Sequence, residues 1–272
     1  MPGMWWAELL NIIAGTLSSA TLPPFDPATL SPLAWYDASD TATLTVASNL
    51  VSQWNDKSGN GYNLTQGTSV ERPDSGLTTR NGLNVVDFDG AASMQAATAA
   101  NWTSLHTNAA GLWAIAWKPN GNNLNNFIFS TRSSAGNGGG AAELNADQRT
   151  AGTKLIVAAL NASGAYVVEN VKTSAYTNNT FTYDTFLNDF GNATAADRSS
   201  IFLENGTAQK GNSETATPGT AAPQVPLNLG KIAGFNIFFT GSICELILVT
   251  GANATEPNRI LLRDYLQTKW GF

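Results

Sequence analysis

The sequence is poor in charge, cysteine and histidine, and each shortage excludes a class of structure. Charged residues make up 12% of the 272 residues, which is about half of the roughly 25% usual in globular domains. The surface must therefore be built largely from Asn, Thr, Ser, Ala and Gly. Cys244 is the single cysteine and His106 the single histidine, so an intramolecular disulfide and a Cys/His zinc site within one chain are both excluded.

Basic residues are also scarce, and this bears on the partners of the chain. The formal net charge is −6, the isoelectric point is near 4.7, and no run of Lys and Arg occurs. Because phosphate contacts need clustered basic side chains, nucleic acid is not an expected partner. Residues 4–17 are mostly apolar but too few to cross a bilayer, so no membrane span is expected.

Short apolar runs rich in β-branched and aromatic residues follow one another from Leu33 onward, separated by turn residues, which is typical of an all-β sandwich. A chain of 28.6 kDa is within the range that forms one such domain. One helix is expected near the end, because Thr255 can cap it, Pro257 suits its first turn and Gly271 can end it. The runs that predict strands are residues 83–88, 112–117, 126–131, 154–160, 165–170, 181–190, 199–204, 235–239 and 243–249.

Residues 1–20 predict an amphipathic helix rather than a cleaved signal peptide, because no basic region precedes the apolar stretch. Such a helix would either pack on its own sandwich or anchor the chain to another subunit. Residues 21–32 are rich in proline and predict a stiff spacer, which favours the anchor. The predicted contact residues of the anchor are Trp5, Trp6, Leu9, Leu10 and Ile13.

Four segments carry a family resemblance. Residues 54–59 read Trp-Asn-Asp-Lys-Ser-Gly, residues 88–90 read Phe-Asp-Gly, residues 241–246 contain a Glu-bearing strand, and residues 265–271 read Tyr-Leu-Gln-Thr-Lys-Trp-Gly. Together they resemble the concanavalin A-like, or laminin-G-like, jelly-roll superfamily as found in tailed-phage virion and bacterial surface proteins. The resemblance implies an all-β jelly-roll sandwich over residues 33–272, preceded by the anchor and the spacer and followed by a short C-terminal helix.

Catalytic patterns known for this fold are not visible in the sequence. Retaining glycosidases within the superfamily that the chain resembles carry a Glu-x-Asp-x-x-Glu or similar motif on one strand, which sets two carboxylates about 5 Å apart. Here each glutamate stands apart from other acids along its own strand, and His106 reads as a surface-loop residue with no nucleophile motif nearby. We therefore expect no catalytic residues and no enzyme activity. The isolated glutamates are Glu143, Glu169, Glu204 and Glu245.

No dedicated metal site is expected, although calcium stays open as an alternative. Many laminin-G-like domains hold Ca²⁺ with Asp, Asn and backbone oxygens. Several aspartates are close in sequence here, but their spacing matches no dedicated calcium loop. They are Asp37, Asp40, Asp56, Asp87 and Asp89.

Sugar binding is a common use of this scaffold, and one strand offers speculative contacts. Trp113 and Trp117 share a strand face by the period of two, and Asn126 follows them. The alternative is that both tryptophans fill the core, which burial preferences favour.

These features together predict a structural protein of a phage virion, either a capsid decoration protein or a head or tail fibre component. Assembled in the host cytoplasm, it would be anchored to a virion protein or to itself through the N-terminal helix and would display a lectin-like sandwich on the particle surface. We expect several copies in the assembly. The alternatives are a carbohydrate-binding adhesin module that recognises a host glycan and, third, a polysaccharide-degrading enzyme. The sequence leaves the oligomeric state open.

Overall fold

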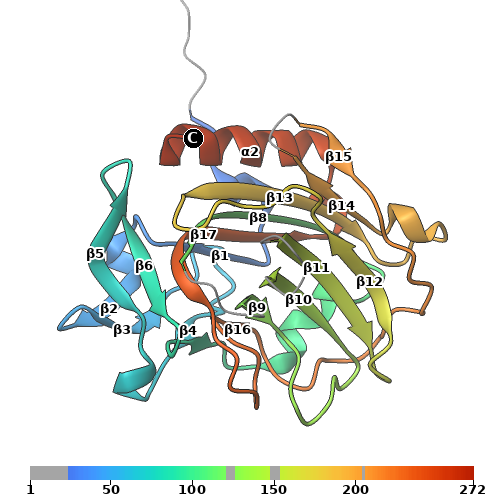
Figure 1. Cartoon of the computed structure of the whole chain (residues 1–272), viewed down its shortest axis with the longest axis horizontal. Coiled ribbons are helices and arrows are strands. Elements are labelled where there is room, and N and C mark those ends of the chain that lie inside the picture. Colours follow the sequence, from blue (N-terminus) through green and yellow to red (C-terminus); the bar gives the residue numbers. More distant parts are fainter. Residues whose placement is uncertain (1–23, 121–125, 148–153, 204–205) are drawn as a thin grey trace, which may run out of the picture.

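Short apolar runs separated by turn residues form strands in the computed structural model. It describes residues 24–120, 126–147, 154–203 and 206–272, which form two packed antiparallel layers of β-strands with a helix across one of them (Figure 1). This confirms the predicted all-β sandwich and the predicted C-terminal helix. The predicted anchor, residues 1–20 with Trp5, Trp6, Leu9, Leu10 and Ile13, lies outside the described residues, as do residues 21–23 of the spacer. The rest of the spacer is described, and Pro27–Leu30 form a 3-10 helix in which Pro27 and Leu30 are buried.

The front layer is organised around β17 (Thr240–Thr250). One edge of β17 pairs with β8, and the other edge pairs first with β6 and then with β1. Beyond β8 follow β13, β14 and β15. The other front strands are β1 (Ala34–Asp37), β6 (Leu83–Asp89), β8 (Ala110–Pro119), β13 (Thr182–Asp189), β14 (Ser199–Phe202) and β15 (Ala208–Gln209).

The back layer runs in the order β7, β16, β9, β10, β11, β12, again with antiparallel pairs. Short strands join the two layers at one end, because β3 pairs with β2, β4 and β5, β4 reaches β7, and β5 reaches β6. The back strands are β7 (Met94–Gln95), β9 (Asn126–Ser130), β10 (Gly140–Asp147), β11 (Lys154–Asn161), β12 (Tyr166–Val171) and β16 (Asn228–Leu229), and the joining strands are β2 (Leu44–Ala47), β3 (Leu50–Trp54), β4 (Leu64–Thr65) and β5 (Asp74–Arg80).

Several of these assignments differ from the sequence-based prediction, whose runs did not include β1 to β5, β7, β10, β15 or β16. Strand β10 was not predicted, because its alanines, asparagine and glutamate have low strand propensity. It forms because it pairs along its whole length with β11 and along part of it with β9. Residues 235–239, predicted to be a strand, instead lie mostly in the loop between β16 and β17.

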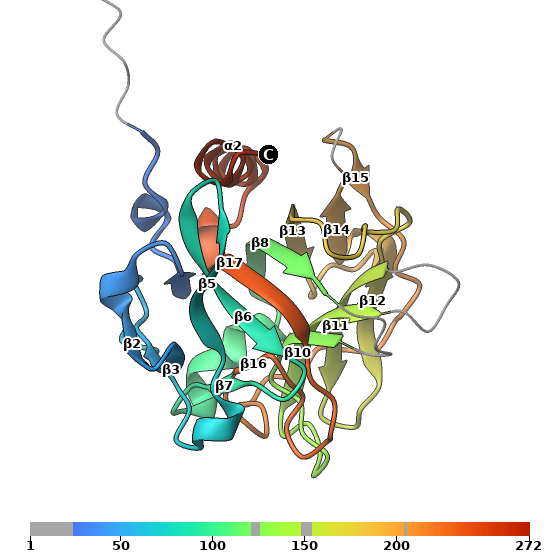
Figure 2. The same ribbon diagram turned by 60° about the vertical axis from the view of Figure 1, so that its left-hand side comes forward.

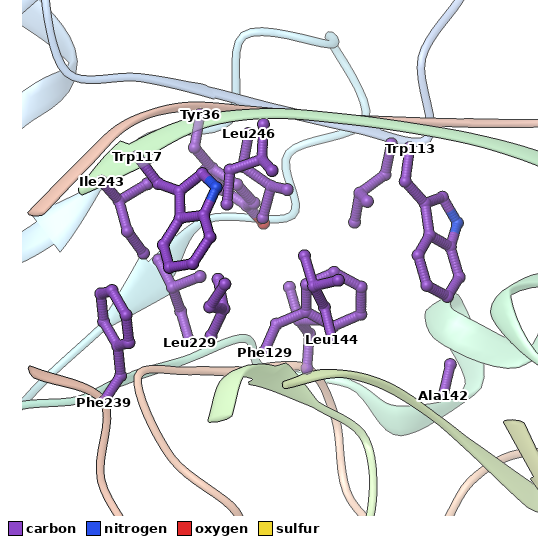
Figure 3. Packing of buried hydrophobic residues seen from close by; sticks show 14 of the residues in the cluster. Tyr36, Trp113, Trp117, Phe129, Ala142, Leu144, Leu229, Phe239, Ile243 and Leu246 are labelled. Atoms are coloured by element: carbon purple, nitrogen blue, oxygen red, sulfur yellow. The ribbon is translucent and has the colours of Figure 1, made fainter. Parts of the chain in front are cut away.

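The core fills the space between the two layers (Figure 3). On β8 the residues Trp113, Ile115 and Trp117 face this core, whereas the alternate residues Leu112 and Ala114 face the opposite side. Such alternation is what a strand requires when both of its faces are buried.

The helix α2 (Glu256–Trp270) covers the outer face of the front layer (Figures 1 and 2). Thr255 accepts a hydrogen bond from the Asn258 backbone N–H at its start, and Gly271 adopts a left-handed conformation with φ of 68° at its end. Leu262, Leu266 and Trp270 are fully buried against the outer side of β8 and β17. The front layer is thus covered on both sides.

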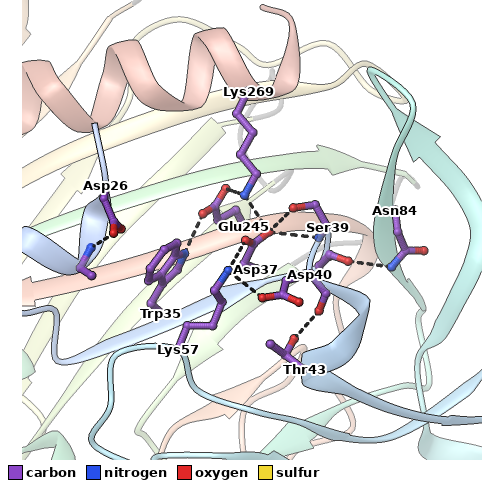
Figure 4. Close-up of polar contacts among 12 residues, drawn as sticks. Asp26, Trp35, Asp37, Ser39, Asp40, Thr43, Lys57, Asn84, Glu245 and Lys269 are labelled. Atoms are coloured by element: carbon purple, nitrogen blue, oxygen red, sulfur yellow. Dashed lines mark hydrogen bonds and ion pairs between the residues drawn. The ribbon is translucent and has the colours of Figure 1, made fainter. Parts of the chain in front are cut away.

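A buried carboxylate fastens this helix to the sandwich (Figure 4). Glu245 on β17 accepts hydrogen bonds from Trp35 Nε1 at 2.7 Å, Trp270 Nε1 at 2.8 Å, Tyr265 OH at 2.9 Å and Lys269 Nζ at 2.9 Å. Lys269 also contacts Asp37 on β1 at 2.8 Å. Burial raises the pKa of Glu245, and the nearby Asp37 raises it further, while Lys269 opposes both. This contact accounts for Tyr265, Lys269 and Trp270 within residues 265–271.

Among the described residues, no helix is both long enough and apolar enough to span a bilayer.

We predict that Glu245→Ala lowers the free energy of unfolding by about 3–5 kcal/mol, because it leaves a buried ammonium group and two indole N–H groups without their shared acceptor. Urea unfolding followed by tryptophan fluorescence measures this loss. The control is Lys210→Ala, which removes an ion pair with Asp197 whose side chains are 52% and 39% exposed. It should cost no more than about 1 kcal/mol. Equal losses in both variants would contradict the assigned role of Glu245.

Candidate ligand-binding site

The outer face of the back layer carries polar side chains in place of a covering helix. On β10, Ala142 and Leu144 face the core, so the alternate residues Glu143 and Asn145 face outward. Register then aligns a second acid with the first, because Glu143 pairs with Ala158 on β11 and Ala158 pairs with Glu169 on β12. The two glutamates are therefore two strands apart on the same face of the sheet.

These side chains line a depression of about 180 Å³. Its floor is the outer face of β9 to β12, and its wall is the loop between β16 and β17. A β-bridge between Lys231 and Phe238 closes the base of this loop. The lining residues are Phe127, Arg132, Glu143, Asn145, Ile156, Ala158, Tyr166, Glu169, Ile232, Phe235 and Ile237.

Glu143 is the most perturbed acid of the depression. Its side chain is almost fully buried, Ser130 Oγ donates to its Oε1 at 3.4 Å, and Arg132 Nη1 lies 3.8 Å from the same oxygen. Burial raises the pKa of Glu143 to about 7, against the opposing effect of Arg132. Near neutral pH this carboxyl group can therefore either donate or accept a proton.

Asn145 presents an unused acceptor beside it. The residue is 5% exposed, and its Oδ1 has no hydrogen-bond partner among the described residues. Leaving a buried polar atom unpaired costs about 1–3 kcal/mol, so buried acceptors of this kind are normally satisfied by water or by a ligand. The depression is thus suited to a ligand that carries hydrogen-bond donors.

Aromatic rings stand at the edge of the depression. Phe235 on the loop is 40% exposed, and Tyr166 on β12 is half-buried. Burial raises the pKa of the Tyr166 hydroxyl, and the nearby Glu143 and Glu169 raise it further. The site therefore combines apolar ring surface, two carboxyl groups, one guanidinium group and an amide.

The residues suggested for sugar contact from the sequence do not line this depression. Trp113 and Trp117 are fully buried and point into the core (Figure 3), and Trp117 Nε1 donates to Asp184 at 2.9 Å. Asn126 is 2% exposed on β9. Neither indole can stack on a ligand, so the alternative, that both tryptophans fill the core, is what the structure shows. The period of two identified their shared face but not the side to which it points.

His106 is buried rather than exposed on a loop, which corrects the expectation from the sequence. Its Nε2 lies 3.0 Å from the Ala221 carbonyl oxygen, and it is fully excluded from solvent. Burial lowers the pKa of His106, so its neutral form is favoured. It contributes nothing to the depression.

The aspartates considered for calcium have structural partners instead. Asp56 accepts hydrogen bonds from the backbone N–H groups of Trp35, Ser58 and Tyr62, as expected for a capped turn. Asp89 accepts from the N–H groups of Ala91 and Ala92. In the described part of the chain no three His, Cys, Asp or Glu side chains converge as a metal site would need. Calcium binding stays a prediction that these contacts do not test.

Sequence reasoning missed Glu143, Asn145 and Glu169 because it searched for acids along single strands. The usable signal was weak: residues 141–146 read Ala-Ala-Glu-Leu-Asn-Ala, with polar residues at every second position. That pattern indicates a strand with one polar face. Only the pairing of β10, β11 and β12 brings the two glutamates together.

Comparisons with known proteins identify the fold. No protein-family model matches the chain, and no curated protein matches it. Domain 4 of a GH43 extracellular arabinanase from Geobacillus stearothermophilus, in complex with arabinotriose, matches with a TM-score of 0.54 and 14% identity over 85% of this chain and 97% of that one. A GH54 α-L-arabinofuranosidase matches with a TM-score of 0.51 and 12% identity over 89% of this chain and 65% of that one. These likenesses show a shared fold, compatible with the predicted jelly-roll sandwich.

The prediction that the chain is not an enzyme is contradicted by these matches, because solved structures with this fold belong to glycoside hydrolases. The expectation had rested on the lack of two acids spaced along one strand. In the structure, Glu143 and Glu169 come from different strands and share one depression. The matches give no support to a virion role.

We predict that Glu143 makes stability depend on pH with a definite sign. Its pKa is about 7 in the folded protein, against an ordinary value of 4.5, so the folded state binds the proton more tightly. The contribution of Glu143 is complete below pH 4.5 and is lost as pH rises through 7. In Glu143→Gln this loss is absent. The difference in free energy of unfolding between the two proteins should change by on the order of 3 kcal/mol between pH 4.5 and 8.5, in favour of the variant at high pH.

Urea unfolding at a series of pH values measures this difference, and titration of the remaining groups cancels in it. A difference that does not change with pH would show that Glu143 has an ordinary pKa in the folded protein.

Proposed function

We propose that this chain binds a neutral carbohydrate in the depression on the outer face of the back layer. The observation that carries the proposal is the unpaired Oδ1 of the buried Asn145, which lies among Glu143, Arg132 and exposed aromatic surface. A saccharide supplies both of the surfaces that such a site needs. Its hydroxyl groups donate and accept hydrogen bonds, and its C–H faces pack on aromatic rings.

Each wall of the depression has a role in this proposal. A sugar hydroxyl donates to Asn145 Oδ1, and Arg132, whose side chain is 32% exposed, donates to a sugar oxygen. The ring of Phe235 offers an apolar face on the opposite wall. Hydrogen bonds to fixed polar groups set the orientation of the sugar, and contact with the ring adds apolar burial.

The size of the depression limits how much of a saccharide it encloses. Its volume of about 180 Å³ is below the roughly 300–1,000 Å³ of sites that enclose a whole small ligand. A single sugar ring therefore occupies the depression, and the neighbouring rings of an oligosaccharide extend over its open rim. No described helix covers this layer, so the rim is accessible to a long chain.

Charge favours a neutral rather than an acidic sugar. The depression holds two carboxyl groups and one guanidinium group, and the whole chain carries a net charge of −6. An acidic sugar would be repelled by Glu169 and by the ionised fraction of Glu143. Arabinotriose, present in the matching arabinanase domain, is a reasonable first probe because it is neutral.

The virion role predicted from the sequence is a separate proposal. It concerns where the protein is displayed and which subunit holds it, and it depends on Trp5, Trp6 and their neighbours, which lie outside the described residues. A carbohydrate-binding depression is compatible with an adhesin on a particle surface, but the contacts described above neither require a virion nor favour one.

We predict that Phe235→Ala weakens oligosaccharide binding about five- to tenfold, as expected when a contact worth roughly 1 kcal/mol is lost. Isothermal titration with arabinotriose, preceded by an array of neutral glycans to find the best ligand, measures this change. The matched control is Leu77→Ala, because Leu77 on β5 is 62% exposed and lies away from the depression. Its affinity should be unchanged. Absence of binding to every neutral glycan, or equal affinities in both variants, would refute the assignment.

A further inference from the structure

We propose that the same depression hydrolyses a glycosidic bond with inversion, Glu143 acting as the general acid and Glu169 as the general base that activates water. The inference rests on the proposed function, because a glycan must first bind where Asn145 and Phe235 hold it. It goes further by assigning a reaction and two catalytic residues.

The register of the back layer sets the spacing of the two acids. Glu143 and Glu169 flank Ala158, one on each neighbouring strand. With strands ~4.8 Å apart, their Cα atoms lie roughly 10 Å apart. Inverting glycosidases separate their two carboxyl groups by about 6.5–9.5 Å, whereas retaining enzymes need about 5–5.5 Å. Two glutamate side chains that leave the same face of the sheet from Cα atoms this far apart can bring their carboxyl groups within the inverting range, with a water molecule and a sugar ring between them.

The residue between the acids is small. Ala158, which lies between the two glutamates in the register, contributes only a methyl group to the floor of the depression. A larger side chain at this position would fill the place where the reacting bond must lie. The same register thus supplies both the pair of acids and the gap between them.

Glu143 has the surroundings of a general acid. Its side chain is buried, with the residue 3% exposed, and Ser130 Oγ donates to its Oε1. Arg132 Nη1 lies 3.8 Å from the same oxygen. Its pKa, raised by burial to about 7, keeps a substantial fraction of the group protonated near neutral pH. General acids of glycosidases are tuned in the same direction.

Glu169 has the more open surroundings that a base needs. It is half-buried on β12, so water can reach it. The backbone of this strand is fixed, because the Glu169 N–H donates to Asn212 Oδ1 at 3.1 Å. Asn145, paired with Ile156 on β11 and lining the same depression, offers its unpaired Oδ1 to a sugar hydroxyl or to the attacking water. This buried acceptor is the independent sign that a ligand belongs in the depression that the acids share.

The step balances with water as the only co-reactant. Glu143 transfers its proton to the glycosidic oxygen as the bond between that oxygen and the anomeric carbon breaks. Glu169 removes a proton from water while the water oxygen bonds to the anomeric carbon from the opposite side. The products are two saccharides, one with a new hemiacetal of inverted configuration. Exchange of protons with solvent returns Glu143 to its acid form and Glu169 to its carboxylate.

The test uses the full chain with soluble neutral polysaccharides, including arabinan, and measures the release of reducing ends. We expect turnover by the wild-type protein that declines as pH rises above about 7, because the acid then loses its proton. Glu143→Gln and Glu169→Gln should each lower turnover by about 100-fold or more, while both still bind oligosaccharide. Leu77→Ala should leave turnover unchanged.

Two further measurements separate catalytic roles from structural ones. An aryl glycoside, whose leaving group needs no proton, should restore turnover in Glu143→Gln but not in Glu169→Gln. Proton NMR of the first product formed should show inversion of the anomeric configuration.

The outcomes distinguish the two proposals. Oligosaccharide binding by the wild type without turnover overturns hydrolysis and leaves the binding function standing. Turnover that both glutamine variants retain, or turnover with retained configuration, overturns the assigned roles of the acids. Neither binding nor turnover overturns the proposed function itself.

Discussion

The contact on which the architecture depends is the buried carboxylate of Glu245. It joins β1, β17 and α2 through Trp35, Lys269 and Trp270, and so holds the helix on the outer side of the front layer. The apolar outer surface of β8 and β17 is thereby covered. The back layer has no described counterpart of α2, and this asymmetry leaves Glu143 and Asn145 facing a depression rather than a packed interface.

The sequence allowed the fold class and the C-terminal helix to be predicted, because both depend on local patterns. Period-two alternation marks strands, and Thr255, Pro257 and Gly271 mark the bounds of α2. The side of the sheet to which a strand face points is not determined by local sequence. Trp113 and Trp117 share a face by alternation, but only the position of β8 between the back layer and α2 shows that both of its faces are buried.

The candidate site could not be predicted from the sequence, because its residues come from several strands and a loop. Its floor includes β10, which was not predicted because its alanines have low strand propensity. Its wall is a loop whose residues 235–239 were predicted to be a strand because they are rich in aromatic residues. Its two acids are neighbours only through the register of three strands. A search for acids spaced along one strand therefore could not find two acids that come together from different strands.

The place of β17 in the chain has a consequence for biosynthesis. This strand is formed by residues 240–250, yet it is the partner of β1, β6 and β8, which the ribosome makes more than a hundred residues earlier. Until it emerges, a nascent chain carries β8 with one edge unpaired, and the carboxylate that seats α2 is missing. Exposed strand edges recruit other strands, and pairing between distant segments is slow. Maturation of the front layer therefore waits until translation of β17 is finished, and until then β8 exposes one unpaired edge.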